Sequence, residues 1–93
     1  EMQALEVLML INNQIGDAGL AHLSKALPEM KGLNELCLQG SNIGDAGLEH
    51  LSKALPEMKN MNIVLSGNNI GDAAKSKFKE EWKKAGVLGI LTM

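Results

Sequence analysis

Two histidines at matching positions of the chain are its most obvious candidates for metal binding. His22 and His50 follow nearly the same short sequence, in segments that we expect to be helical. Neighbouring packed helices lie about 8–10 Å apart, whereas each nitrogen that binds a zinc ion must come within about 2.1 Å of it. A third copy of the pattern has Lys77 at this position, which cannot complete a metal site. We therefore expect both histidines on the surface, and no metal ion or other cofactor.

Cys37 and two glycines are the other residues whose chemistry invites a functional interpretation. The neighbours expected beside Cys37, Met9 and Val64, are apolar and offer neither a cation nor a base to stabilise a thiolate. We therefore expect an ordinary exposed thiol. Gly16 and Gly44 belong to an Ile-Gly-Asp-Ala-Gly turn that lacks the spacing and the lysine of a phosphate-binding loop. These patterns predict no catalytic residue, and we do not expect an enzyme.

Composition narrows the class of partner and the compartment. The chain has 93 residues, a formal net charge of -2 and no arginine, and its lysines form no basic block. Binding to nucleic acid through neutralisation of phosphates is therefore disfavoured. The longest apolar run, Val7 to Ile11, is far too short to cross a bilayer. We therefore expect no membrane contact. Since the lone cysteine cannot form an intrachain disulfide, a cytoplasmic location is expected.

A repeat predicts the elements that position these residues. Residues 15–30 and 43–58 are identical except at one position, where Ala21 corresponds to Glu49. The tripeptide Ile-Gly-Asp occurs three times, first at Ile15, with spacings of 28 and 27 residues. The chain is therefore predicted to contain about two and a half copies of one structural unit. Both residues at the variable position, Ala21 and Glu49, are expected to be exposed.

Each unit is predicted to be a short strand followed by a helix. Leu8 and Leu10 are two residues apart, as are side chains on one face of a strand. Leucines at helical spacing follow further along the unit. Asp17 and Asp45 are suited to cap the starts of their helices. Pro28 is expected to end the first helix, because a proline disfavours helical backbone angles at the residue before it.

The full pattern resembles the leucine-rich repeat in its ribonuclease-inhibitor-like form: LxxLxLxxN, then Ile-Gly-Asp-x-Gly and two helical leucines, at a period of 28 residues. The Ile-Gly-Asp-Ala-Gly turn is also similar to the C-terminal repeats of nucleotide-binding leucine-rich-repeat receptors. The resemblance implies a right-handed α/β solenoid, a horseshoe segment with parallel strands on its concave side and helices on its convex side. It further implies that Asn13, Ser41 and Asn68 point inward, where an amide bonds the loop backbone of the next repeat.

Element spacing agrees with a curved stack. Neighbouring strands lie about 4.8 Å apart, whereas packed helices need about 8–10 Å, so a stack with strands on one side and helices on the other must bend. The third unit has Phe78 and Trp82 at core leucine positions within a strongly polar helix, as a terminal repeat requires. Gly86 is predicted to end this helix. The expected organisation is a single leucine-rich-repeat domain, residues 1–93, with repeat units at about 5–32, 33–60 and 61–86 and a C-terminal cap at about 73–93.

Residues between the inward-facing leucines of each strand should face the concave surface, where leucine-rich repeats usually bind their partners. They form three columns across the sheet, and the apolar middle column hints at contact. Scattered exposed apolar residues are also normal, so β-forming residues that merely fill a strand are the alternative interpretation. The candidate protein-binding face consists of Val7, Met9, Ile11, Glu35, Cys37, Gln39, Asn62, Val64 and Ser66.

Together these features favour a non-enzymatic protein–protein interaction module. We expect a fragment of a longer intracellular leucine-rich-repeat protein, such as an innate immune sensor, with a protein as its partner. The near-identity of the first two units favours an alternative, a structural scaffold or engineered consensus-like solenoid with no ligand of its own. Since no cap precedes Leu5, the fragment is also expected to self-associate through an uncapped N-terminal face, most simply as a two-fold dimer.

Overall fold

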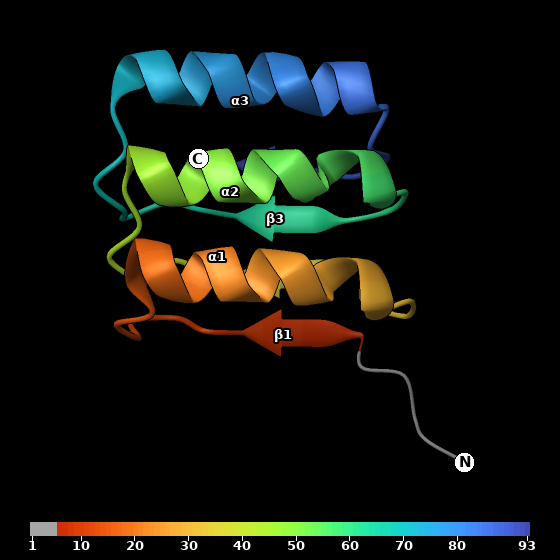
Figure 1. Ribbon diagram of the computed structural model, residues 1–93, viewed down its shortest axis with the longest axis horizontal. Coiled ribbons are helices and arrows are strands. Elements are labelled where there is room, and N and C mark those ends of the chain that lie inside the picture. Colours follow the sequence, from red (N-terminus) through yellow and green to blue (C-terminus); the bar gives the residue numbers. More distant parts are fainter. Residues whose placement is uncertain (1–5) are drawn as a thin grey trace.

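Strands and helices alternate along residues 6–93, the part of the chain that the computed structural model describes (Figure 1). Leu5, the expected start of the first unit, lies outside the described residues. The strands are β1 (Val7–Met9), β2 (Glu35–Cys37), β3 (Asn62–Val64) and β4 (Leu91–Thr92). The helices are α1 (Gly16–Ala26), α2 (Asp45–Ala54) and α3 (Asp72–Ala85), and short 3-10 helices, η1 (Leu27–Glu29) and η2 (Leu55–Glu57), extend the first two.

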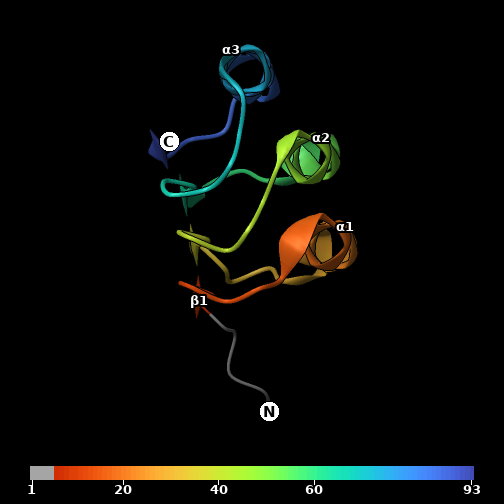
Figure 2. The ribbon, with the colours of Figure 1, turned by 90° about the vertical axis from the view of Figure 1, so that its left-hand side faces the viewer.

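The strands form one parallel sheet in the order β1-β2-β3-β4. Leu8 pairs with Leu36 and Leu36 with Ile63, so equivalent residues of successive units lie side by side. Figure 2 shows the strands in one layer and all three helices in a second layer on the same side of the sheet. The predicted α/β class and the parallel strands are therefore confirmed, and one face of the sheet is left open.

The core lies between the sheet and the helices. Phe78 and Trp82 are buried, with 2% and 9% of their surface exposed, and pack in one apolar cluster with Leu51 and Leu55. This confirms that the aromatic residues of the third unit take core positions. Gly86 ends α3 in the left-handed region at φ 70°, as predicted, because glycine adopts this conformation without steric cost.

The aspartates of the Ile-Gly-Asp motif link one unit to the next. The prediction that Asp17 and Asp45 cap their own helices is wrong, because neither side chain bonds an amide at the start of its own helix. Asp17 Oδ1 accepts a hydrogen bond from the Gly44 amide at 2.7 Å, and Asp45 Oδ1 from the Gly71 amide at 2.8 Å. Each carboxylate thus holds the residue that precedes the following helix.

Asn68 makes a second link between units. Its Nδ2 donates to the carbonyls of Leu38 and Leu65 at 2.8 and 2.9 Å. Its Oδ1 accepts from the amides of Ser41 and Ile43 at 2.8 and 3.0 Å. The expected inward amide is therefore present, but it bonds the loop of the preceding unit and not that of the next one.

Ser41 and Asn13, which correspond to Asn68 in the first two units, make different hydrogen bonds. Ser41 is fully buried, and its hydroxyl donates to the Leu10 carbonyl of the first unit. Asn13 is exposed, and its side-chain amide donates only to the nearby Ile11 carbonyl at 3.3 Å. The inward position expected of Asn13 is therefore wrong for this unit, since among residues 6–93 no preceding loop lies beside it.

Candidate protein-binding face

The open face of the sheet carries the residues predicted to bind a partner. Leu36 and Ile63 point into the core and are fully buried. Because side chains alternate along a strand, the residues before and after them point to the open face. The strand register sets these residues in two rows: Val7, Glu35 and Asn62, and then Met9, Cys37 and Val64.

A third row continues the face past the ends of the strands. The Asn12 amide donates to the Gln39 carbonyl at 2.8 Å, and the Gly40 amide donates to the Ser66 carbonyl at 3.1 Å. These bonds extend the parallel pairing, so Ile11, Gln39 and Ser66 follow one another across the three units as expected.

The apolar side chains of the first unit are the most exposed part of this face. Val7, Met9 and Ile11 expose 41%, 60% and 37% of their surface. The residues that correspond to Met9 in the later units are more covered: Val64 is half-buried and Cys37 is buried. The predicted apolar middle row is therefore open to a partner mainly at Met9.

Cys37 corrects one expectation, because it exposes only 3% of its surface. It lies between the neighbouring residues Met9 and Val64, and its Sγ donates to a carboxylate oxygen of Glu35 at 3.7 Å. Burial, and then the negative charge of Glu35, raise the pKa of the Cys37 thiol. A buried thiol that stays protonated is a poor nucleophile. The expectation of an exposed thiol is therefore wrong.

Gln39 contributes a hydrogen-bond acceptor that sequence reasoning could not identify. Its side-chain oxygen is buried and has no hydrogen-bond partner among the described residues. A buried polar atom without a partner costs free energy that a donated hydrogen bond would recover. The sequence predicts Gln39 on this face only through its place in the strand pattern, and nothing in the sequence signals the unpaired oxygen.

Ile90 was missed by sequence reasoning. It exposes 69% of its surface and lies directly before Leu91, which pairs with Ile63 and packs against the core. By the alternation of a strand, Ile90 therefore belongs to the open face. The apolar alternation around Gly89 could have identified this residue, because it continues the pattern of the earlier strands.

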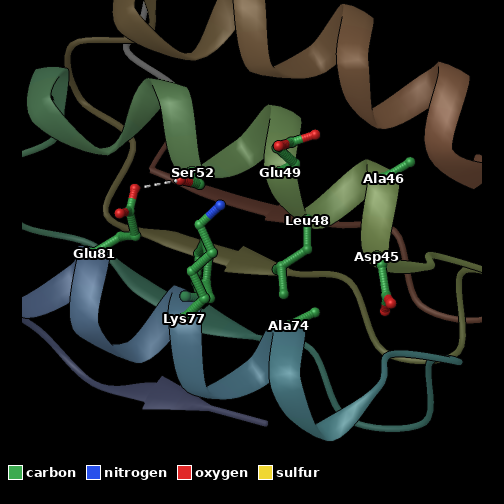
Figure 3. A pocket seen from close by; sticks show the side chains of 9 residues that line it. Asp45, Ala46, Leu48, Glu49, Ser52, Ala74, Lys77 and Glu81 are labelled. Atoms are coloured by element: carbon green, nitrogen blue, oxygen red, sulfur yellow. Dashed lines mark hydrogen bonds between the residues drawn. The ribbon is translucent and has the colours of Figure 1, made fainter.

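A groove of about 240 Å³ lies on the helix side, between α2 and α3 (Figure 3). Ser52 Oγ donates to Glu81 Oε1 across it at 2.9 Å, and Lys77 reaches from α3 toward α2. The apolar residues beneath, Leu48 and Phe78, are each only 2% exposed. A ligand in the groove would therefore reach little of these two large apolar side chains.

One glycine position distinguishes the contact between α1 and α2 from the contact between α2 and α3, where this groove lies. A Cβ on Gly47 would overlap the Asp17 carboxylate, so glycine allows α1 and α2 to approach closely. The sequence places Ala74 at the corresponding position of α3, and Ala74 lines the groove. Helices α2 and α3 contact each other less extensively than α1 and α2 do, and we attribute this difference to the Ala74 methyl group.

The histidines remain outside any candidate site. His22 lies on α1 and His50 on α2, and both are exposed. Within residues 6–93, no group of three or more His, Cys, Asp and Glu side chains is placed to hold a metal ion. None of the helices in this part of the chain combines the length and the apolar character that a membrane crossing needs.

No protein-family model matches this chain, and no curated protein matches it either.

Proposed function

We propose that this chain is a non-enzymatic protein-binding module, a segment of a right-handed α/β solenoid of the leucine-rich-repeat type, whose partner binds the open face of the sheet. Support for the solenoid comes from three strand–helix units in chain order, with every helix on one side of the sheet. Because strands space more closely than helices, further units would curve the open face into a concave surface.

The exposure of Met9 and its two apolar neighbours carries this proposal. Val7, Met9 and Ile11 lie in one line on and just after β1, and each exposes more than a third of its surface. Contiguous exposed apolar surface on a regular sheet is typical of an interaction site. The unpaired Gln39 oxygen lies in the same row as Ile11, and a rotation of the Gln39 side chain would bring this buried oxygen to a donor from a partner.

These groups define the chemistry of the partner. Met9 fits an apolar side chain, and Gln39 fits an N–H donor. Glu35 is the one charged residue among the nine face residues and favours a lysine or arginine opposite it. We therefore propose a protein segment that presents an apolar anchor flanked by a cation and an amide donor.

The chemical state of Cys37, the only cysteine of the chain, is consistent with a binding role without catalysis. Cys37 is buried, and its raised pKa keeps the thiol protonated. Such a thiol supports neither nucleophilic chemistry nor an exposed disulfide, which also favours the cytoplasm as its location. Within this proposal the sequence resemblance favours an innate immune sensor as the parent protein.

A structural scaffold without a ligand is the second candidate. The burial of Cys37 in the middle of the face and the bonds of Asn68 between units favour it, because both serve packing. The two candidates differ in what they predict for Met9, which a scaffold does not need to keep accessible or apolar.

Site-specific photocross-linking separates these candidates. A photoreactive phenylalanine analogue replaces Met9 in one variant and Glu49, an exposed residue of α2, in the matched control. The proposal predicts a protein that cross-links from position 9 and not from position 49, and whose capture is lost when Ile11→Asp is added. The same set of proteins from both positions, or none from position 9, would support the scaffold instead.

A further inference from the structure

We propose that the outer edge of β4 and the basic flank of α3, defined by Lys75, Lys79 and Lys83, form a docking surface for an extended protein segment in which apolar and acidic residues alternate. The segment adds a fifth strand to the four-stranded sheet and directs its acidic side chains toward α3. This surface lies at the edge of the sheet opposite β1, the strand that residues 1–5 precede. The inference does not depend on the proposed binding function of the open face.

The backbone of β4 forms strand hydrogen bonds on one side. The carbonyls of Ile90 and Thr92 accept from the amides of two residues on and just after β3, at 2.9 and 2.7 Å. Leu91 stands between them and pairs through neither group, so its N–H and C=O point to the outer edge. Among residues 6–93, no strand lies beside that edge. These backbone groups can therefore pair with a strand that a partner supplies.

The basic flank faces the same end of the stack as this edge. Lys75 and Lys79 occupy the positions that Leu48 and Ser52 have 27 residues earlier, in the second unit. Leu48 and Ser52 line the groove toward α3, and Ser52 Oγ donates to Glu81 of α3. The corresponding side of α3 therefore faces away from α2. Figure 2 shows α3 set further along the stack than β4, so that a fifth strand would lie level with α3.

Lys79, at the centre of the basic flank, has no acidic neighbour on its helix. Residues three and four positions apart are neighbours on a helix surface. Lys75 and Lys83 each have one carboxylate at this spacing, Asp72 and Glu80. The neighbours of Lys79 are two lysines, a serine and a tryptophan, and like charges at this spacing destabilise a helix. A carboxylate from a partner would supply the missing opposite charge.

Leu88 and Ile90 provide the apolar part of the surface. They expose 68% and 69% of their side-chain-bearing residues, and Leu88 lies two residues before Ile90, on the same face of the sheet. A strand beside β4 would place every second side chain next to them, where apolar pairs stabilise a sheet. The side chains between would point to the helix side, toward the lysines. The surface therefore favours a segment in which apolar and acidic residues alternate.

Two other occupants fit this surface less well. The residue at the position of Lys75 in the second unit is Leu48, which is buried at the contact with α3. A further repeat helix packed on α3 in the same way would bury the Lys75 ammonium against apolar surface, which costs free energy. A second copy that pairs through β4 about a two-fold axis would bring two basic flanks together, and they would repel each other. An acidic extended segment meets neither cost.

A synthetic peptide tests the proposal. The probe is an eight-residue peptide of alternating valine and glutamate with blocked ends, titrated into the full chain and followed by nuclear magnetic resonance. The control peptide has lysine in place of every glutamate and should not bind. At saturation with the probe, we expect the Leu91 amide to exchange at least about tenfold more slowly. The Ile90 amide, which already donates to Asn62 Oδ1 at 2.8 Å, should change little.

Two matched variants test the basic flank. Lys79→Glu should weaken binding of the probe about fivefold or more, whereas Lys84→Glu, at an exposed lysine of α3 outside the flank, should leave it within about twofold. Equal losses in the two variants would overturn the proposal. So would a probe that does not bind, a control peptide that binds equally well, or binding that leaves the Leu91 amide unprotected. Protection of Leu91 that rises with the concentration of the chain alone would show that a second copy occupies the edge, and would overturn it too.

Discussion

Asp17 and Gly44 are 27 residues apart in the chain, and the carboxylate of the first accepts the backbone amide of the second at 2.7 Å. The pair Asp45 and Gly71 repeats this contact one unit later at 2.8 Å. A hydrogen bond to a charged group contributes more than one between neutral groups. The Ile-Gly-Asp motif therefore supplies both halves of a link between units, the amide toward the unit before and the carboxylate toward the unit after.

Loss of this carboxylate should destabilise the protein. Asp17→Ala leaves the Gly44 amide without its acceptor in a partly buried position, and we expect a loss of about 1–3 kcal/mol. Asp72→Ala is the matched control, because Asp72 has the same place in the third unit but is exposed. Its expected cost is less than about 1 kcal/mol, through the helix dipole. Urea unfolding compares the two variants, and equal losses would contradict the link.

Helix spacing should respond to one methyl group. Gly47→Ala places a Cβ against the Asp17 carboxylate and should cost about 1–3 kcal/mol, although alanine favours helices. Ala74→Gly provides the reverse exchange at the contact between α2 and α3, where we expect only the loss of helix propensity, about 1 kcal/mol. Thermal unfolding measures both effects. A Gly47→Ala protein that is more stable than the original would show that α1 and α2 can separate without cost.

Truncation of Trp82 in α3 should be costly. It is buried against the core, so Trp82→Ala is expected to cost about 3–5 kcal/mol. The adjacent Lys83 is exposed, and Lys83→Ala should change stability by no more than about 0.5 kcal/mol. Denaturant unfolding of each variant and of the original chain measures both changes in the free energy of unfolding. A loss well under 1 kcal/mol for Trp82→Ala would mean that the cap does not depend on this side chain.

Alkaline pH should destabilise the fold through Cys37. Its pKa is raised in the folded state by burial and by the charge of Glu35, so folding favours the protonated thiol. The resulting stability is present below the pKa of the unfolded thiol and is lost as pH rises through the folded value. Glu35→Gln should lower the folded pKa part of the way, since burial remains. Alkylation rates across pH measure the thiol directly, and a profile unaffected by Glu35→Gln would exclude the charge effect.

Local sequence patterns predicted the parts of the fold that depend on local physics. The two-residue spacing of Leu8 and Leu10 predicted a strand segment, which the structure places at β1 and the residue after it. The larger side chain at Trp82 predicted a core position, and Gly86 predicted the helix end. The rows of residues on the open face were predictable as well, because similar units that pair in parallel register align their equivalent residues.

Contacts between units were not predictable in the same way. Aspartate is a residue type that often caps the start of a helix, so the sequence predicted this role for Asp17. Only the position of Gly44 in the next unit reveals the actual partner of its carboxylate. Cys37 is flanked on both sides by strands and covered by Glu35, so its burial depends on three separate segments. The unpaired Gln39 oxygen likewise depends on how neighbouring side chains cover it.

The affinity of the partner captured from position 9 tests the proposed function most directly. Isothermal titration compares the original chain with Met9→Asp, which places a charge in the most exposed apolar position of the face, and with Glu49→Lys on the helix side. We predict that Met9→Asp weakens binding at least about tenfold, whereas Glu49→Lys leaves it within about twofold. Equal affinity for the original chain and for Met9→Asp would contradict binding through the open face.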